Sequence, residues 1–224
     1  MGIDDDRHHE SHHERSHDCR QELDDARTDA LGLLRIQAHA NRLANARLHR
    51  AMAALGPEDW QAPRTGFFPS LAATLNHILG VDLYYIAALQ GDAHADRQWA
   101  QFQPAASLAE LAPRQAASDE RLIAWLAAAD AAALGAVVQL PRGGGRIQRD
   151  RAAHVLQHLL MHQMHHRGQA HAMLSSTAAA PPQLDEFLMP SEAHLRNADM
   201  AALGWAEAAV YGRPPPGMPP GTPP

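Results

Sequence analysis

The segment from His154 to Leu174, HVLQHLLMHQMHHRGQAHAML, holds six of the sixteen histidines in the chain. Its apolar residues recur at helical spacing and form one arc when each residue advances by about 100° around the axis. His162 and His166, one turn apart, lie on or beside that arc. The other four histidines fall outside it: His154, His158, His165 and His171. The segment therefore predicts a helix that directs two imidazoles into a protein core.

Two histidines at i and i+4 suit a small divalent ion, because both rings can reach one point from Cβ atoms about 5–6 Å apart. Two imidazoles are too few for a tight site, so we expect a third ligand from another helix. His77 is the candidate, since it is the one histidine in the strongly apolar run from residue 71 to residue 89. Three neutral imidazoles leave a coordination position free, which is typical of a reactive metal rather than a closed structural one.

Each of these histidines also has a purely structural interpretation. A single histidine in a core is more often a hydrogen-bonded packing residue than a ligand, and this alternative stays open for His77. For the pair at His162 and His166 the two interpretations are about equally supported. We interpret the four histidines outside the arc as surface groups, with His158, one turn before His162, as the candidate for a supporting contact to a ligand.

Hydrophobic periodicity predicts an all-α fold, a four-helix bundle with a short β-hairpin between helices three and four and an extra C-terminal helix. The expected helices run over Thr28–Leu55, Ser70–Gln90, Ser107–Ala129, Asp150–Leu174 and Ser191–Val210, with the hairpin over residues 137–148. Residues 60–69 and 92–104 are expected to be loops. The first of these loops carries Phe67 and Phe68, and loops of this kind often cover a pocket.

A chain of 224 residues can build one sizeable core, and we expect a single domain over residues 28–211. Residues 1–27 are polar and rich in histidine, so we expect a disordered or marginally helical tail. A solvated tail is favoured there over a metal-delivery arm. Residues 212–224 are expected to form a disordered Pro-rich tail.

Charge and cysteine usage narrow the class of protein. The net charge of -6 argues against nucleic-acid binding, which needs a basic face. The single cysteine, Cys19, fits a reducing cytoplasm. The N-terminus lacks the basic-then-apolar pattern of a secretory signal, and we expect no segment to span a membrane.

Several polar residues fall within the expected core. Asp82 is expected to pair with an Arg or a polar backbone group in preference to acting as a base, since an unpaired buried carboxylate is costly. Asn41 and Asn45 are expected to have a structural use. Arg167 is expected to link the helices of the bundle through carboxylates.

Together these residues resemble the DinB/YfiT-like superfamily of metal-binding four-helix bundle proteins. The resemblance covers residues 31 to 190 and rests on three ordered pieces: NRLAN from Asn41, GFFPS leading into LNH at His77, and HQMHHRGQ from His162. It maps the superfamily's three-histidine site onto His77, His162 and His166. It also implies a divalent metal such as zinc or nickel, and a homodimer.

The superfamily includes thiol-dependent S-transferases and isomerases beside members with no known substrate. The resemblance therefore implies a metal-dependent enzyme that activates a low-molecular-weight thiol for transfer to a small-molecule substrate. A metal-activated water that attacks an ester or amide is an equally open interpretation. The non-enzymatic alternative is a metal-binding bundle protein without turnover.

Overall fold

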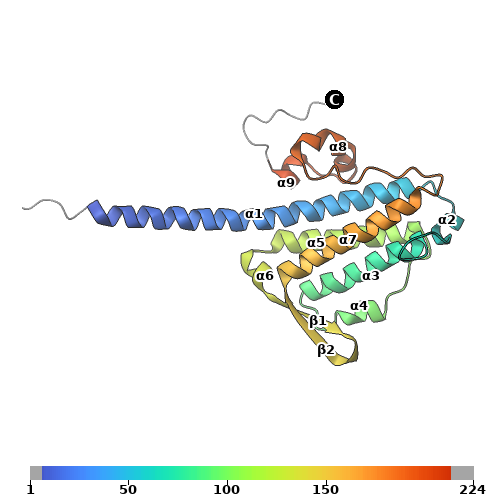
Figure 1. The fold of residues 1–224 in the computed structure, drawn as a ribbon, viewed down its shortest axis with the longest axis horizontal. Helices are drawn as coiled ribbons and strands as arrows, with labels where there is room; N and C mark the ends of the chain where they lie inside the picture. Colours follow the sequence, from blue (N-terminus) through green and yellow to red (C-terminus); the bar gives the residue numbers. More distant parts are fainter. Residues whose placement is uncertain (1–6, 213–224) are drawn as a thin grey trace, which may run out of the picture.

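Four long helices form a bundle in the computed structural model, which describes the backbone of residues 7–212 and the side chains of residues 30–212. They run side by side, and α1 continues beyond the other three (Figure 1). These helices are α1 (Arg7–Met52), α3 (Leu71–Leu89), α5 (Leu108–Ala128) and α7 (Ala152–Leu174). The expected all-α bundle is confirmed.

The bundle is closed by contacts of α1 with α5 and α7, and of α3 with α5 and α7. α3 and α5 begin where expected, because the hydroxyls of Ser70 and Ser107 accept hydrogen bonds from the backbone N–H of the third helical residue. Small side chains such as Ala38, Ala87 and Ala170 are fully buried, which allows the helices to pack closely.

α3 is apolar around most of its circumference. In the described part of the chain it is the one helix long and apolar enough to cross a membrane, yet 78% of that segment is buried inside the protein. Its apolar surface is thus used for packing against α5, α7 and the short helices beside it.

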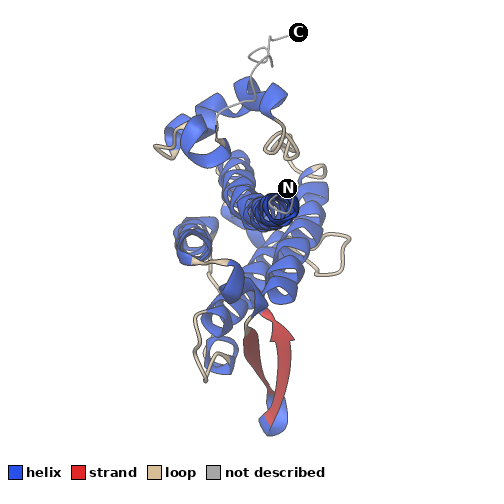
Figure 2. Cartoon of the chain, turned by 90° about the vertical axis from the view of Figure 1, so that its left-hand side faces the viewer, coloured by secondary structure: helices blue, strands red, loops and turns tan. Residues whose placement is uncertain are grey.

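A two-stranded hairpin joins α5 to α7, as expected. The short helix α6 (Ala131–Gly135) precedes it, and β1 (Val137–Arg142) pairs with β2 (Arg146–Arg151) in antiparallel register. The hairpin projects from one side of the bundle (Figure 2). The hydroxyl of Tyr84 on α3 donates a 2.9 Å hydrogen bond to the carbonyl of Pro141, which fixes the hairpin against α3.

The C-terminal segment packs on the outer face of α1. Its short helices are α8 (Ala193–Ala202) and α9 (Glu207–Tyr211), preceded by a 3-10 turn (Pro190–Glu192). We expected one helix there, but the chain turns at Gly204, whose φ of +70° favours glycine. Arg47 on α1 joins this layer through Glu186 and Asp199.

Other boundaries also differ from expectation. α1 begins at Arg7 rather than near Thr28, and the sequence between residues 7 and 31 contains no Gly or Pro to stop a helix. Asp150 lies in β2 and α7 begins after it. The expected loop over residues 92–104 contains the short helix α4 (Asp96–Ala100), and the short helix α2 (Pro57–Gln61) ends just inside the expected loop over residues 60–69. The histidine side chains of residues 1–27 and the tail from residue 213 lie outside the described parts.

Candidate metal centre

Three imidazoles from two helices converge at one point. His77 lies on α3, and His162 and His166 lie one turn apart on α7. One ring nitrogen from each histidine lies within 4.8 Å of the other two, and Nε2 of His77 is 2.9 Å from Nε2 of His162. The packing of α3 against α7 thus brings together the three side chains that the sequence singled out.

The spacing of these nitrogens fits a metal ion. Zinc bound tetrahedrally at about 2.0–2.1 Å places two imidazole nitrogens roughly 3.4 Å apart. This spacing lies between the 2.9 Å that separates the Nε2 atoms of His77 and His162 and the 4.8 Å within which all three ring nitrogens lie. Two neutral rings can share only one hydrogen across their Nε2 contact, whereas a cation satisfies a lone pair on each. Nδ1 of His162 is buried and has no partner among the described residues, so protein contacts at Nδ1 do not hold this ring.

His166 is oriented by Gln169, three residues further along α7. Nδ1 of His166 lies 2.8 Å from Oε1 of Gln169, an oxygen that can only accept, so Nδ1 carries the hydrogen. In the neutral ring the lone pair is then on Nε2. Gln169 therefore fixes the tautomer that a metal ligand needs.

All three rings are held in the neutral form. Burial, with a contribution from the nearby His166, lowers the pKa of His77 to about 4. Burial and the neighbouring histidines lower the pKa of His162 to about 3. Burial also lowers the pKa of His166, although its hydrogen bond to Gln169 opposes the shift. At neutral pH each ring thus has a free lone pair, which metal binding requires.

The loop after α2 covers one side of the cluster, as expected. The ring of Phe68 lies 4.5 Å from that of His77 and 5.4 Å from that of His166 between centroids. The backbone N–H of Arg64 donates to the carbonyl of Pro69 at 2.7 Å, which closes the base of the loop. Phe68 thus shields two of the three rings from solvent on this side.

Trp99 of α4 lies on another side of the cluster, with its ring 6.0 Å from that of His77. It approaches α3 at Gly80, where a Cβ atom would lie 3.1 Å from the indole ring. The lack of a side chain at Gly80 therefore allows Trp99 to pack beside His77 of the cluster.

A cavity of about 480 Å³ opens beside His162 between α3, α4, α7 and the hairpin. Its main side chains are Tyr84, Tyr85, Trp99, Arg142, His158 and His162. The guanidinium of Arg142 lies over both tyrosine rings, 5.3 and 5.7 Å from their centroids, and donates to the hydroxyl of Tyr85 at 3.3 Å. We call this space the aromatic cavity. Its volume is within the range of about 300–1,000 Å³ typical of small-molecule sites.

Asp82 lies behind the ligands, in the interior of the bundle. Its Oδ2 accepts a 2.7 Å hydrogen bond from Gln115 and another from Gln163, the residue after His162. Its partners are thus amides rather than the expected Arg or backbone group. Burial, with the charge of Asp119 adding to it, raises the pKa of Asp82 well above the usual range. Asp82 therefore ties α7 to α3 next to a ligand.

Arg167, beside His166, points away from the cluster, as expected. It is buried and donates to the side-chain oxygens of Asn41 and Asn45 on α1. Its charge also faces Asp82 and Asp119. The structural use expected for the two asparagines is confirmed, and Arg167 links the helices, although its direct partners are amides instead of carboxylates.

The remaining histidines of α7 stay outside the cluster. His154, His158 and His165 are exposed, and His171 bonds the carbonyl of Pro182 at 2.8 Å. The supporting contact expected from His158 is not formed: its ring lies 6.3 Å from that of His162 between centroids, Nδ1 of His162 has no partner among the described residues, and His158 lines the aromatic cavity instead. His165 contacts Gln169 at 3.0 Å.

Two residues beside the site were not found from the sequence. The sequence contained a pattern that could have indicated Gln169, because a polar residue three positions after a candidate ligand lies on the same helix face. No sequence pattern indicates Arg142, since it lies in a hairpin whose placement depends on tertiary contacts. Both belong to the surroundings of the three imidazoles.

The fold and the cluster define a class of protein, a helical bundle with three histidines that could hold a metal ion. The family model described as the DinB family matches residues 36–199. This match covers well over half of the chain, and the protein belongs to the DinB family. A search of curated proteins gave no match.

Proposed function

We propose that the protein is a metal-dependent enzyme in which His77, His162 and His166 hold one divalent ion, Zn²⁺ or Ni²⁺. The observation that carries this proposal is the aromatic cavity, because His162 belongs both to its wall and to the cluster. Among the described residues, no fourth His, Cys, Asp or Glu joins the cluster. Three protein ligands beside a substrate-sized cavity are the arrangement of a catalytic metal site.

When bound, the ion supplies Lewis acidity and lowers the pKa of a thiol or water that reaches it. The residues of this chain shield the ligands from water and orient them. Phe68 excludes water from one side of the ligands, and Gln169 keeps His166 in the required tautomer. Substrate enters from the other side, where the aromatic cavity is open.

The walls of the aromatic cavity indicate the kind of substrate. Tyr84, Tyr85 and Trp99 offer apolar ring surfaces, and Arg142 offers a guanidinium whose described hydrogen bonds go to the uncharged groups of Tyr85 and Gln148. Asp96 also lines this space, so an anionic group of a bound molecule would lie against Arg142 and away from that carboxylate, with the apolar part of the molecule against the rings. We infer a thiol cofactor or its electrophilic partner in this space, in line with the S-transferases of the superfamily.

A reactivity screen tests the proposal. The metal-loaded protein is assayed with low-molecular-weight thiols paired with electrophiles, and in parallel with esters and amides in the absence of thiol. Turnover that needs a thiol supports the transferase, and turnover without one supports the hydrolase. The His77→Ala variant serves as the control without metal. Absence of turnover across both panels, with metal bound, would favour a binding protein instead.

We further infer a cytoplasmic homodimer, with α7 at the interface. Met161, Met164 and Leu188 expose apolar side chains on one face and line a common hollow. Exposed apolar patches of this kind often mark contacts between proteins. Light scattering after gel filtration should give a dimer for the wild-type protein and a monomer for Met164→Glu. A monomeric wild-type protein would rule the dimer out.

A further inference from the structure

Two neighbouring tyrosines in the wall of the aromatic cavity use their hydroxyls in different ways. The hydroxyl of Tyr84 donates its hydrogen to the carbonyl of Pro141 at 2.9 Å, so this hydrogen is not available to a ligand. The hydroxyl of Tyr85 accepts a hydrogen bond from Nη2 of Arg142 at 3.3 Å, and its own hydrogen has no acceptor among the described residues. Because a phenol both donates and accepts, Tyr85 keeps one donor for a bound molecule, next to a guanidinium.

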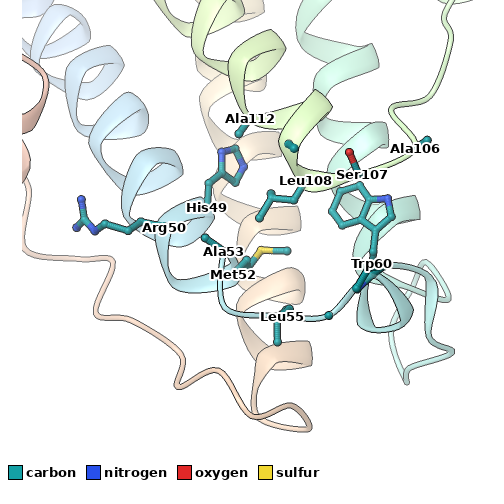
Figure 3. A pocket seen from close by; sticks show the side chains of 13 residues that line it. His49, Arg50, Met52, Ala53, Leu55, Trp60, Ala106, Ser107, Leu108 and Ala112 are labelled. Atoms are coloured by element: carbon teal, nitrogen blue, oxygen red, sulfur yellow. The ribbon is translucent and has the colours of Figure 1, made fainter.

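Arg142 brings a positive charge to the same wall. Its described hydrogen bonds go to Tyr85 and Gln148, and it forms no ion pair with a described residue. A cavity of about 540 Å³ at the end of α1 differs in this respect, because Arg50, the one Arg, Lys, Asp or Glu in its lining, points away from the space toward Asp199, with which it pairs (Figure 3). The aromatic cavity therefore offers an anion a guanidinium that no described carboxylate contacts.

The positions of these two donors favour a carboxylate. Nη2 of Arg142 lies within hydrogen-bond distance of the Tyr85 oxygen, so a carboxylate can accept from the guanidinium with one oxygen and from the phenol with the other. An uncharged carbonyl could accept from Tyr85 but would leave the charge of Arg142 without a counter-ion. Asp96 lines the same space and repels an anion, so the carboxylate belongs at the Arg142 side of the cavity.

We propose that Tyr85 and Arg142 determine the specificity of the aromatic cavity, by holding a carboxylate of the substrate between the phenol O–H and the guanidinium. The apolar part of the substrate then lies against the rings of Tyr84 and Trp99. That the bound molecule is a substrate rests on the proposed function, whereas the binding of its carboxylate requires neither the metal ion nor turnover.

Isothermal titration calorimetry of the full-length protein with 4-phenylbutanoate and with 4-phenylbutanamide tests the proposal. The two probes have the same apolar part and nearly the same shape, and they differ in charge. The wild-type protein should bind the carboxylate about tenfold or more tightly than the amide, because hydrogen bonds to a charged group are the stronger ones. The same preference is expected after a chelator has removed the metal ion.

The ratio of the two affinities separates recognition of the carboxylate from damage to the cavity. Tyr85→Phe removes the hydroxyl and Arg142→Gln removes the charge, and each should lower this ratio by about tenfold. A general loss of packing would weaken both probes equally. Arg146→Gln is the matched control, since Arg146 pairs with Arg142 across the hairpin but is exposed and does not line the cavity. It should keep the wild-type ratio.

Several results would overturn the proposal. The wild-type protein could bind both probes equally or neither of them, Tyr85→Phe could keep the wild-type ratio, or Arg146→Gln could lower it as much as Arg142→Gln does. Loss of carboxylate binding after removal of the metal would place the carboxylate on the ion instead. Failure of the proposed function is distinguishable, because turnover would then be absent from the reactivity screen while the affinity ratios stay as expected.

Discussion

Replacement of Arg167 by Met should strongly destabilise the protein, because this residue places a buried guanidinium in the polar group between α1, α3, α5 and α7. Its guanidinium donates to Asn41 at 2.5 Å and to Asn45 at 3.0 Å. Its charge faces the fully buried carboxyls of Asp82 and Asp119, and the charge of Arg42 also acts on Asp119. Burial lowers the pKa of Arg167 to about 10, so it remains charged at neutral pH.

The expected loss of stability can be calculated from the groups that Arg167→Met leaves unpaired. Two buried amide oxygens lose a charged donor, at about 1.5–3 kcal/mol each, and the carboxyls lose their counter-charge. Uptake of a proton by a carboxyl offsets part of this loss, so we expect a total near 3–5 kcal/mol, which comes mainly from the two amide oxygens. For a protein of this size that corresponds to a fall in Tm of about 6–20 °C.

The pH dependence separates this explanation from a simple packing defect. Burial raises the pKa of Asp119 to about 6, so at pH near 5 this carboxyl is mostly protonated in the folded wild-type protein. Arg167 then offsets less negative charge, and its loss should cost less than at pH near 7. Thermal melting of Arg167→Met and the wild type at both pH values measures the difference.

Arg149→Met is the matched control, because Arg149 is exposed on the hairpin and its replacement should change stability by no more than about 0.5 kcal/mol. A fall in Tm of under 3 °C for Arg167→Met would show that the polar group does not depend on its cation. An equal fall at both pH values would show that Asp119 does not titrate as described.

Two predictions concern the metal centre. Gln169→Ala should weaken metal binding by about 10–100-fold, as is usual when a ligand loses its supporting hydrogen bond. The control Gln157→Ala, on an exposed face of α7, should leave the metal affinity unchanged. Equal affinities of the two variants would refute the role of Gln169. Burial lowers the pKa of His77 to about 4, that of His162 to about 3 and that of His166 below its ordinary value. Protons therefore compete weakly, and equilibrium dialysis should show that metal affinity begins to fall at a lower pH than for three ordinary histidines. A decline that begins near 6.5, the ordinary pKa of histidine, would contradict this.

Much of the fold was predictable, because it depends on local signals. Ser70 caps α3 where its side chain and the apolar run after it indicate. The hairpin was also found, from a short apolar strand followed by glycines. The three histidines of the cluster could also be predicted: helical periodicity places His162 and His166 on one face, and His77 is the one histidine in the apolar run from residue 71 to residue 89.

The features that were missed depend on contacts between distant parts of the chain. Asp82 was expected to pair with an Arg or a polar backbone group, yet its hydrogen bonds come from the amides of Gln115 and Gln163. The position of Arg142 beside the metal centre depends on the Tyr84–Pro141 hydrogen bond, which no local pattern reveals.

The most direct measurement is the metal content of the protein from which residues 1–27 are deleted, so that the tail histidines cannot bind adventitious metal. After loading with Zn²⁺ or Ni²⁺ and dialysis, elemental analysis should find about one ion per chain in this protein and in His165→Ala, whose ring lies beside the cluster but outside it. His77→Ala and His162→Ala should retain almost none. Undiminished metal in either of these two variants would contradict the three-histidine centre on which the proposed chemistry rests.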